Sequence, residues 1–332
     1  MTKVVTYVDL FCGLGAFHLA FDRCSTPDLQ YQCLFACDID PNIRKLYHEN
    51  FGLVPEGDLH QLENHQIPTA DLLCAGFPCQ PFSVAGQKQG FADPLQGTLI
   101  HKVIDILRSK LELQCPIPTV ILENVKNILT MEEGKPFREI VNQLESLGYH
   151  VSYQLIDSKD YGSPQSRKRV YLIASLHQPY HFPEIKLPMC PVSSIIDFSH
   201  ETYLDYSKKY KLVPCPPNRT MIKYRLFNLN TGKGGYQGYR VYSIDNYGPT
   251  ICANSGGPGA RTGLYLINGR IRTLTIGETL KMFGFPSDYQ YRSLKYPNQL
   301  ISYLGNSIVV EVLYPLISFV KLKQTASSPE GN

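Results

Sequence analysis

One cysteine in this chain is placed as a nucleophile would be. The stretch 71–80 reads Asp-Leu-Leu-Cys-Ala-Gly-Phe-Pro-Cys-Gln, so an apolar run of strand length ends at a glycine and a proline. Cys79 therefore falls in a loop just past the carboxyl end of the predicted strand, where open α/β sheets bind their ligands. Cys74 lies inside the apolar run, as a small buried cysteine would. The position of Cys79 past the end of the strand thus predicts that Cys79 is the reactive thiol.

Charged side chains follow other predicted strands. Glu123 comes directly after the β-branched run 119–122, where a carboxyl group would suit hydrogen bonding to a ring nitrogen or an amino group; a surface charge or a helix-start acid is the alternative. Arg167 and Arg169 lie two residues apart on a predicted strand and so share a face. They could bind substrate oxygens in a cleft, or merely protect an exposed strand edge.

The amino-terminal stretch reads as a nucleotide-binding crossover. A predicted strand, 4–11, runs into Phe11-Cys-Gly-Leu-Gly15 and then into a helix-like stretch, 17–21. Some twenty residues on, the strand 33–37 ends at Asp38-Ile-Asp40. We assign Asp38 to a ribose diol, because a carboxylate accepts two hydroxyl hydrogens, and Asp40 to the cap of a helix over 43–50. Asp58 is another loop acid, with a turn residue as the alternative.

Composition excludes several classes of protein. The net charge of +3 comes from 32 basic and 29 acidic residues and by itself implies no partner. Ten cysteines at irregular spacing, with no Cys-x-x-Cys pair, favour reduced thiols over disulfides or a zinc site, so we expect no metal. The chain shows no run of about twenty apolar residues and no signal-peptide pattern, so membrane insertion and secretion are not expected.

The charge distribution is more informative than the net charge. Between Tyr206 and Ile244 there are eight Lys or Arg residues, six tyrosines and no Asp or Glu. Such a segment could follow a phosphate backbone while aromatic and glycine residues approach bases, or it could be a solvated basic face. Past His177 prolines become frequent and helical periodicity fades, which indicates a second, smaller domain.

Taken together, these residues resemble the cytosine-5 DNA methyltransferases of the bacterial restriction-modification type. The similarity covers nearly the whole chain apart from the middle of the basic segment. Two departures are Ala16, where the family commonly has a glycine, and 93–97, which lacks an arginine that the family usually carries. The similar motifs, in their shared order, are Asp9-Leu-Phe-Cys-Gly-Leu-Gly15, Gly76-Phe-Pro-Cys-Gln80, Glu123-Asn-Val125, Gln165-Ser-Arg-Lys-Arg169, Arg272-x-Leu-Thr-x-x-Glu278 and Gly305-Asn-Ser307.

The resemblance implies an α/β fold: a doubly wound, mostly parallel sheet of the S-adenosylmethionine-dependent methyltransferase type, with a smaller, irregular target recognition domain. It implies a catalytic and cofactor-binding domain at 1–178 and a recognition domain with its hinge at 179–286. The chain would then return to the catalytic domain at 287–324, and 325–332 would be a disordered tail.

The resemblance also implies the chemistry. Cys79 would attack carbon 6 of a flipped cytosine, Glu123 would bind ring nitrogen 3 and the amino group, Arg167 would hold the 2-oxygen, and Arg169 would steady the site. The cofactor would be S-adenosyl-L-methionine, leaving S-adenosyl-L-homocysteine as product. Its expected binding residues are Phe11, Gly13, Leu14, Gly15, Asp38, Ile39, Asp58, Pro78, Asn306 and Ser307.

The expected partner is double-stranded DNA. The segment 232–243, with Thr250, is similar to that of the HhaI-type enzymes that modify GCGC sites, which makes GCGC the expected target and Gln237, Arg240 and Thr250 the expected DNA contacts. The resemblance further implies a monomer, cytoplasmic in bacteria or nucleus-associated and not secreted, with no membrane partner and with a cognate restriction endonuclease acting on the same site.

Three other functions compete with this interpretation. A transfer-RNA cytosine methyltransferase of the same family would typically carry a Cys-Phe-Thr signature, which is not found in this sequence. A catalytically silent DNA-binding relative would tend to lose the cysteine or the glutamate, and Cys79 and Glu123 are both present. An amino-group methyltransferase is disfavoured because the chain lacks an Asn-Pro-Pro-Tyr type loop.

Overall fold

The computed structural model describes residues 2–78, 98–216, 221–254 and 256–320. Its larger sheet has six strands in the order β2-β1-β3-β4-β6-β5. Neighbours pair in parallel from β2 through β4, and β6 runs antiparallel to both β4 and β5. The strands span Lys3–Leu10 (β1), Leu29–Cys37 (β2), Leu72–Gly76 (β3), Thr119–Val125 (β4), His150–Asp157 (β5) and Lys168–Ser175 (β6).

Both faces of this sheet are buried, because apolar side chains alternate along its central strands. In β3, Leu72 and Cys74 pack into one core while Leu73 and Ala75 pack into another. In β6, Tyr171 and Leu172 divide in the same way. The sheet therefore separates two hydrophobic cores, as the predicted doubly wound architecture requires.

The helices divide between the two faces. Residues of α1, α2, α6 and α7 contribute to the first core, and those of α3 and α4 to the second. The prediction that Asp40 caps a helix is confirmed, since its carboxylate accepts the N–H of Asn42 at 2.8 Å. The helices span Ala16–Cys24 (α1), Pro41–Phe51 (α2), Thr98–Glu112 (α3), Lys135–Ser146 (α4), Ile276–Met282 (α5), Gln299–Asn306 (α6) and Val310–Ser318 (α7).

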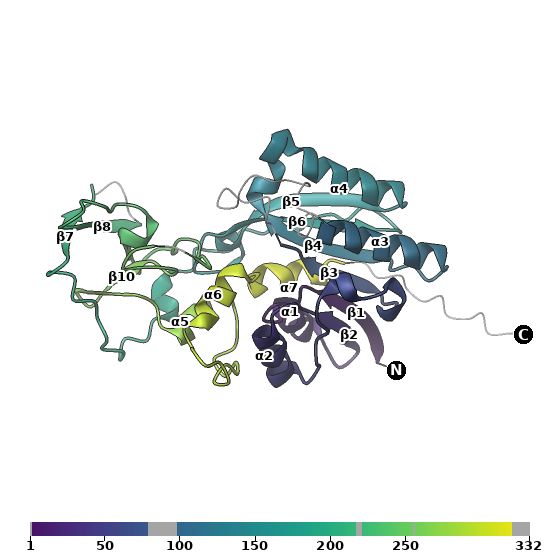
Figure 1. Cartoon of the computed structure of the whole chain (residues 1–332), viewed down its shortest axis with the longest axis horizontal. Coiled ribbons are helices and arrows are strands. Elements are labelled where there is room, and N and C mark those ends of the chain that lie inside the picture. Colours follow the sequence, from purple (N-terminus) through teal and green to yellow (C-terminus); the bar gives the residue numbers. More distant parts are fainter. Residues whose placement is uncertain (1, 79–97, 217–220, 255, 321–332) are drawn as a thin grey trace, which may run out of the picture.

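A second, five-stranded sheet, which we call the recognition sheet, follows in the order β11-β10-β9-β8-β7. Figure 1 shows it at the opposite end of the molecule from the larger sheet, with α5 and α6 between them. The resemblance implied a smaller, irregular domain here, whereas the described residues form a regular sheet. Its strands span Tyr210–Pro214 (β7), Ile222–Asn228 (β8), Arg240–Ser243 (β9), Leu264–Ile267 (β10) and Arg270–Arg272 (β11).

The carboxyl-terminal helices close the first core. The stretch Gln299–Ser318 is long and apolar enough to cross a membrane by length and composition, but 56% of it is buried inside the protein. It is also broken between α6 and α7, and α7 packs against α1. These features are those of core helices. The predicted disordered tail, 325–332, lies outside the described residues.

Candidate active site at the carboxyl edge of the larger sheet

Most of the predicted catalytic and cofactor side chains meet at one edge of the larger sheet. β1 and β3 are neighbours whose chains continue to opposite sides, so the sheet has its switch point between them, where α/β proteins form a ligand crevice. β4 ends at the same edge, and the antiparallel β6 begins there. Cys79, the predicted nucleophile, follows Pro78 in the sequence and lies outside the described residues.

Glu123 is the central carboxyl group of the site. It lies in β4 near the carboxyl end of the strand, opposite Gly76 of β3 and Tyr171 of β6. Its side chain is only 9% exposed, so it is neither a surface charge nor a helix-start acid. Burial raises the pKa of Glu123, while the cations of Arg169 and Arg167 hold part of that rise back.

The two arginines of the Gln-x-Arg-x-Arg motif lie in different surroundings. Arg169 is paired with β4 in the sheet, and its Nε lies 3.1 Å from Oε1 of Glu123. That ion pair lacks hydrogen-bond geometry, so Oε1 keeps no hydrogen-bond partner among the described residues. Arg167 instead donates to three backbone carbonyls, at distances of 2.8–2.9 Å. Neither arginine protects an exposed edge, because β6 lies between β4 and β5.

Asn124 connects β4 to the loop that carries the cysteine. Its Nδ2 donates to the carbonyl of Phe77 at 3.1 Å, and its Oδ1 accepts the N–H of Val125 at 2.8 Å. A Cβ at Gly76 would come within 3.1 Å of Ile308, so a glycine lets the end of β3 lie close to the chain after α6. Asn124 was not among the predicted site residues, although its place directly after Glu123 in the Glu-Asn-Val motif was a signal for it.

The turn after β1 has the shape that a bound nucleotide needs. Gly13 and Gly15 both have positive φ, and a Cβ at Gly15 would lie 2.2 Å from the ring of Phe51. Asp38 stands at the end of β2 and accepts the N–H groups of Gly13 and Asp40, at 3.1 and 2.9 Å. Burial raises the pKa of Asp38, and these two hydrogen bonds oppose the rise.

The other predicted cofactor residues differ in exposure and hydrogen bonding. Ile39, directly after Asp38, is 72% exposed, which leaves an apolar side chain open to solvent. Asp58 accepts the N–H of His60, and Pro78 and Asn306 are exposed. Leu14 is buried in the core, so its backbone is the part available to a ligand. A part-exposed ribose acid, glycines and an open apolar side chain are compatible with a nucleoside such as that of S-adenosylmethionine.

The three predicted DNA contacts are engaged within the protein. Gln237 donates to the carbonyl of Thr250 at 2.7 Å, and Arg240 donates to Gly235 at 2.9 Å. The hydroxyl of Thr250 donates to the carbonyl of Ser166 at 2.6 Å. These side chains therefore position the recognition sheet in this structure, and their contact with DNA stays a prediction.

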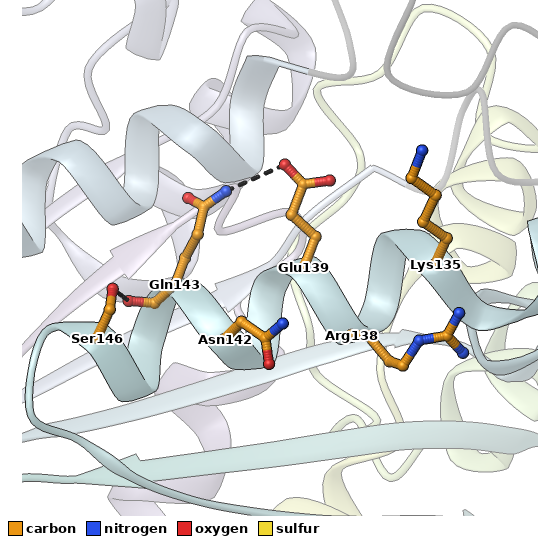
Figure 2. A pocket seen from close by; sticks show the side chains of 6 residues that line it. All are labelled: Lys135, Arg138, Glu139, Asn142, Gln143 and Ser146. Atoms are coloured by element: carbon orange, nitrogen blue, oxygen red, sulfur yellow. Dashed lines mark hydrogen bonds between the residues drawn. The ribbon is translucent and has the colours of Figure 1, made fainter.

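Two surface hollows lie away from this edge. One, of about 400 Å³, is formed by a single face of α4, where Figure 2 shows Gln143 hydrogen bonded to Glu139. Another, of about 310 Å³, includes Thr119 and Ser175, where β4 begins and β6 ends. It therefore lies at the opposite edge from Glu123. Neither hollow contains a predicted site residue, and we assign neither to the chemistry.

The fold and the site define an α/β protein with a ligand crevice at the switch point of its sheet, and comparison with known proteins narrows this class. The family of C-5 cytosine-specific DNA methylases matches residues 5–321. The type II methyltransferase M.HhaI of Haemophilus parahaemolyticus is 34% identical over 313 residues, 92% of this chain and 91% of that protein. M.MspI of Moraxella sp is 32% identical over 338 residues, 98% of this chain and 73% of that protein.

Solved structures agree on the fold. That of the Entamoeba histolytica methyltransferase EhMeth has a TM-score of 0.72 at 20% identity and covers 96% of this chain and 98% of its own. That of the S. pombe Dnmt2 methyltransferase has a TM-score of 0.70 at 18% identity, covering 95% and 97%. The chain belongs to the C-5 cytosine-specific DNA methylase family and is a DNA cytosine-5 methyltransferase.

Proposed function

We propose that this enzyme transfers a methyl group from S-adenosyl-L-methionine to carbon 5 of a cytosine that has been flipped out of duplex DNA, through a covalent adduct with Cys79. The observation that carries the proposal is the buried carboxyl group of Glu123. It lies one strand from the Phe77–Pro78 loop that leads to Cys79, and its Oε1 has no hydrogen-bond partner among the described residues. A carboxyl group with a raised pKa can supply a proton to ring nitrogen 3.

Each residue of the site has a defined task in this mechanism. The thiolate of Cys79 adds to carbon 6, and Glu123 holds a proton at nitrogen 3, so that carbon 5 becomes enamine-like and nucleophilic. The bound cofactor supplies an electrophilic methyl group, which carbon 5 takes up. Loss of the proton from carbon 5 then expels the thiolate and restores the ring. Because stacking hides both ring faces in a duplex, the cytosine has to leave the helix first.

The arginine positions lead us to revise one assignment within the proposal. Both terminal nitrogens of Arg167 are occupied by backbone carbonyls, whereas Arg169 lies beside the carboxyl group of Glu123. We therefore place Arg169, rather than Arg167, against the 2-oxygen of the cytosine. Asp38 would bind the ribose, Asp58 the adenine amino group, and the segment Gly305–Ser307 the amino-acid end of the cofactor.

The target would be a short duplex motif, with GCGC as the specific proposal because of the similarity to M.HhaI. The basic segment would bind the phosphate backbone, and Gln237 would enter the duplex after releasing Thr250. A monomer acting beside a cognate restriction endonuclease, in a bacterial cytoplasm, completes the proposal.

The test is methyl transfer from labelled S-adenosylmethionine to mixed-sequence duplex DNA and, in parallel, to transfer RNA, with methylated cytosines mapped by bisulfite sequencing. Wild type is compared with Cys79→Ser and with the matched control Cys115→Ser. We expect transfer to DNA at GCGC, retained in the control and lost in Cys79→Ser. Transfer to RNA alone would refute the DNA substrate, methylation at another motif would refute GCGC, and an active Cys79→Ser would refute the covalent step.

A further inference from the structure

Arg167 is a buried cation whose guanidinium makes no hydrogen bond to a carboxylate in the described part of the chain, although its backbone N–H donates to Asp157 at 3.0 Å. Its guanidinium donates to Ile251 at 2.9 Å, to Gly305 at 2.8 Å and to Ser307 at 2.9 Å, all at backbone oxygens. It also stands over the ring of Phe283, 5.3 Å from the ring centre. Burial, aided by the charge of Arg169, lowers the pKa of Arg167 to about 9. A charge buried at such cost is poorly explained by stability alone.

The three carbonyl groups belong to two segments with different tasks. Gly305 and Ser307 flank Asn306 at the end of α6, in the segment proposed to hold the cofactor. Ile251 lies in the segment 248–252, which we call the hinge segment. It connects β9 to β10 within the recognition sheet, and its Gly248 is hydrogen bonded to Pro164 and Ser166, just before β6 of the larger sheet. The side chain of Arg167, two residues before Arg169, thus joins the segment proposed to hold the cofactor to the hinge segment.

The hinge segment leaves little room for independent movement. Its Gly248 exchanges backbone hydrogen bonds with Pro164 and Ser166, at 2.8 and 3.0 Å. On its other side a Cβ at Gly305 would lie 2.2 Å from the backbone nitrogen of Ala253. Because close-packed segments cannot move independently of each other, a ligand that orders the segment Gly305–Ser307 would also restrain the hinge segment.

We propose that Arg167 is a positioning residue that couples cofactor binding to DNA binding. When the cofactor holds the segment Gly305–Ser307 in place, Arg167 fixes the hinge, and the recognition sheet meets DNA already oriented. Linkage requires DNA to tighten cofactor binding by the same factor. The inference rests on the proposed cofactor and DNA sites, but a coupling factor can be measured separately from either affinity.

The experiment measures dissociation constants for S-adenosyl-L-homocysteine with and without a target duplex, and for the duplex with and without S-adenosyl-L-homocysteine, by calorimetry. We expect coupling of about tenfold in the wild type, equal in both directions. Arg167→Met should reduce the coupling to less than about twofold. The matched control Lys168→Met changes the exposed neighbour on β6 and should keep the wild-type factor.

Arg167→Lys and Gly305→Ala keep the test decisive if Arg167→Met does not fold. A lysine retains the charge, but its single ammonium group cannot donate to both segments as the guanidinium does. The added Cβ of Gly305→Ala pushes the same two segments apart. Both variants should therefore lose coupling. If Arg167 has a purely structural role, its substitution should weaken the binding of both ligands and leave the coupling factor between them unchanged. That result would overturn the inference. A wild type that binds each ligand without coupling would overturn it too, whereas a wild type that binds neither would refute the proposed function.

Discussion

The Arg272–Glu278 pair beside the recognition sheet and the Arg169–Glu123 pair at the edge of the larger sheet use the same two residue types, yet their bonding is opposite. Arg272 grips Glu278 through both terminal nitrogens, each at 2.7 Å. Glu278 also accepts the N–H groups of Thr275 and Asp197, so both its oxygens are fully used. Among the described residues, Glu123 has one ion-pair contact, and its Oε1 has no hydrogen-bond partner.

The pKa values separate the pairs in the same way. Burial pushes the pKa of Glu278 up, but its hydrogen bonds from Arg272 and from two backbone N–H groups outweigh burial and the pKa is lowered. Burial prevails at Glu123, whose pKa is raised. A saturated carboxylate holds the fold, whereas an unsaturated one keeps the capacity to bind and protonate a substrate. The difference teaches that hydrogen-bond saturation, more than burial, distinguishes the structural Glu278 from Glu123, the glutamate that we propose to be catalytic.

The largest expected effect is on activity at Glu123. Glu123→Gln should lower methyl transfer by about 10²–10⁴-fold, because the amide cannot supply the proton, while the midpoint of denaturant unfolding changes little. Steady-state transfer of labelled methyl groups measures the activity, and urea unfolding measures the midpoint. Glu145→Gln, on the exposed face of α4, is the control. Retained activity in Glu123→Gln would contradict the proposal that Glu123 supplies the proton.

The next largest effect is on stability at Arg272. Arg272→Met should destabilise the fold by about 3–5 kcal/mol, since it leaves the buried carboxylate of Glu278 without its cation. The matched control is Arg270→Met, at an exposed arginine of β11 that stacks over Tyr203. It should cost about 0.5–1 kcal/mol. Urea unfolding followed by circular dichroism measures both. Equal midpoints for the two variants would show that Arg272 is not structural.

The smallest effect is a contrast in pH dependence. The pKa of Glu123 is raised above its ordinary value of 4.5, so the folded state binds the extra proton and stability falls as pH rises from about 4.5 through the folded pKa. The pKa of Glu278 is lowered, so its contribution is complete above 4.5 and is lost as pH falls through the folded pKa. Each pKa unit corresponds to about 1.4 kcal/mol.

These opposite pH dependences can be tested by measuring the free energy of unfolding of Glu123→Gln and of Glu278→Gln, each against the wild type, at a series of pH values. Glu123→Gln should gain on the wild type as pH rises above 4.5, and Glu278→Gln should lose its disadvantage as pH falls below 4.5. Parallel curves for the two variants would contradict the comparison.

Local patterns in the sequence were sufficient for much of the fold. The apolar run 119–122, the helix-like stretch 17–21 and the Asp40-Pro41 start predicted β4, α1 and the cap of α2, because adjacent residues carry the signals for a buried strand, a helix and a helix cap. The recognition sheet escaped prediction. Its short strands pair across loops rich in glycine, so no local periodicity marks them.

The sequence by itself determined the family, the class of reaction and the identity of the charged residues, since their order along the chain identifies the motifs. Only the tertiary structure decided how each charge is used. Arg167 and Arg169 are equivalent in the sequence, yet one donates to three carbonyls and the other lies beside Glu123. The reason is that hydrogen-bond partners contributed by Ile251 and Gly305 are distant in the chain, and long-range packing alone brings them to one guanidinium.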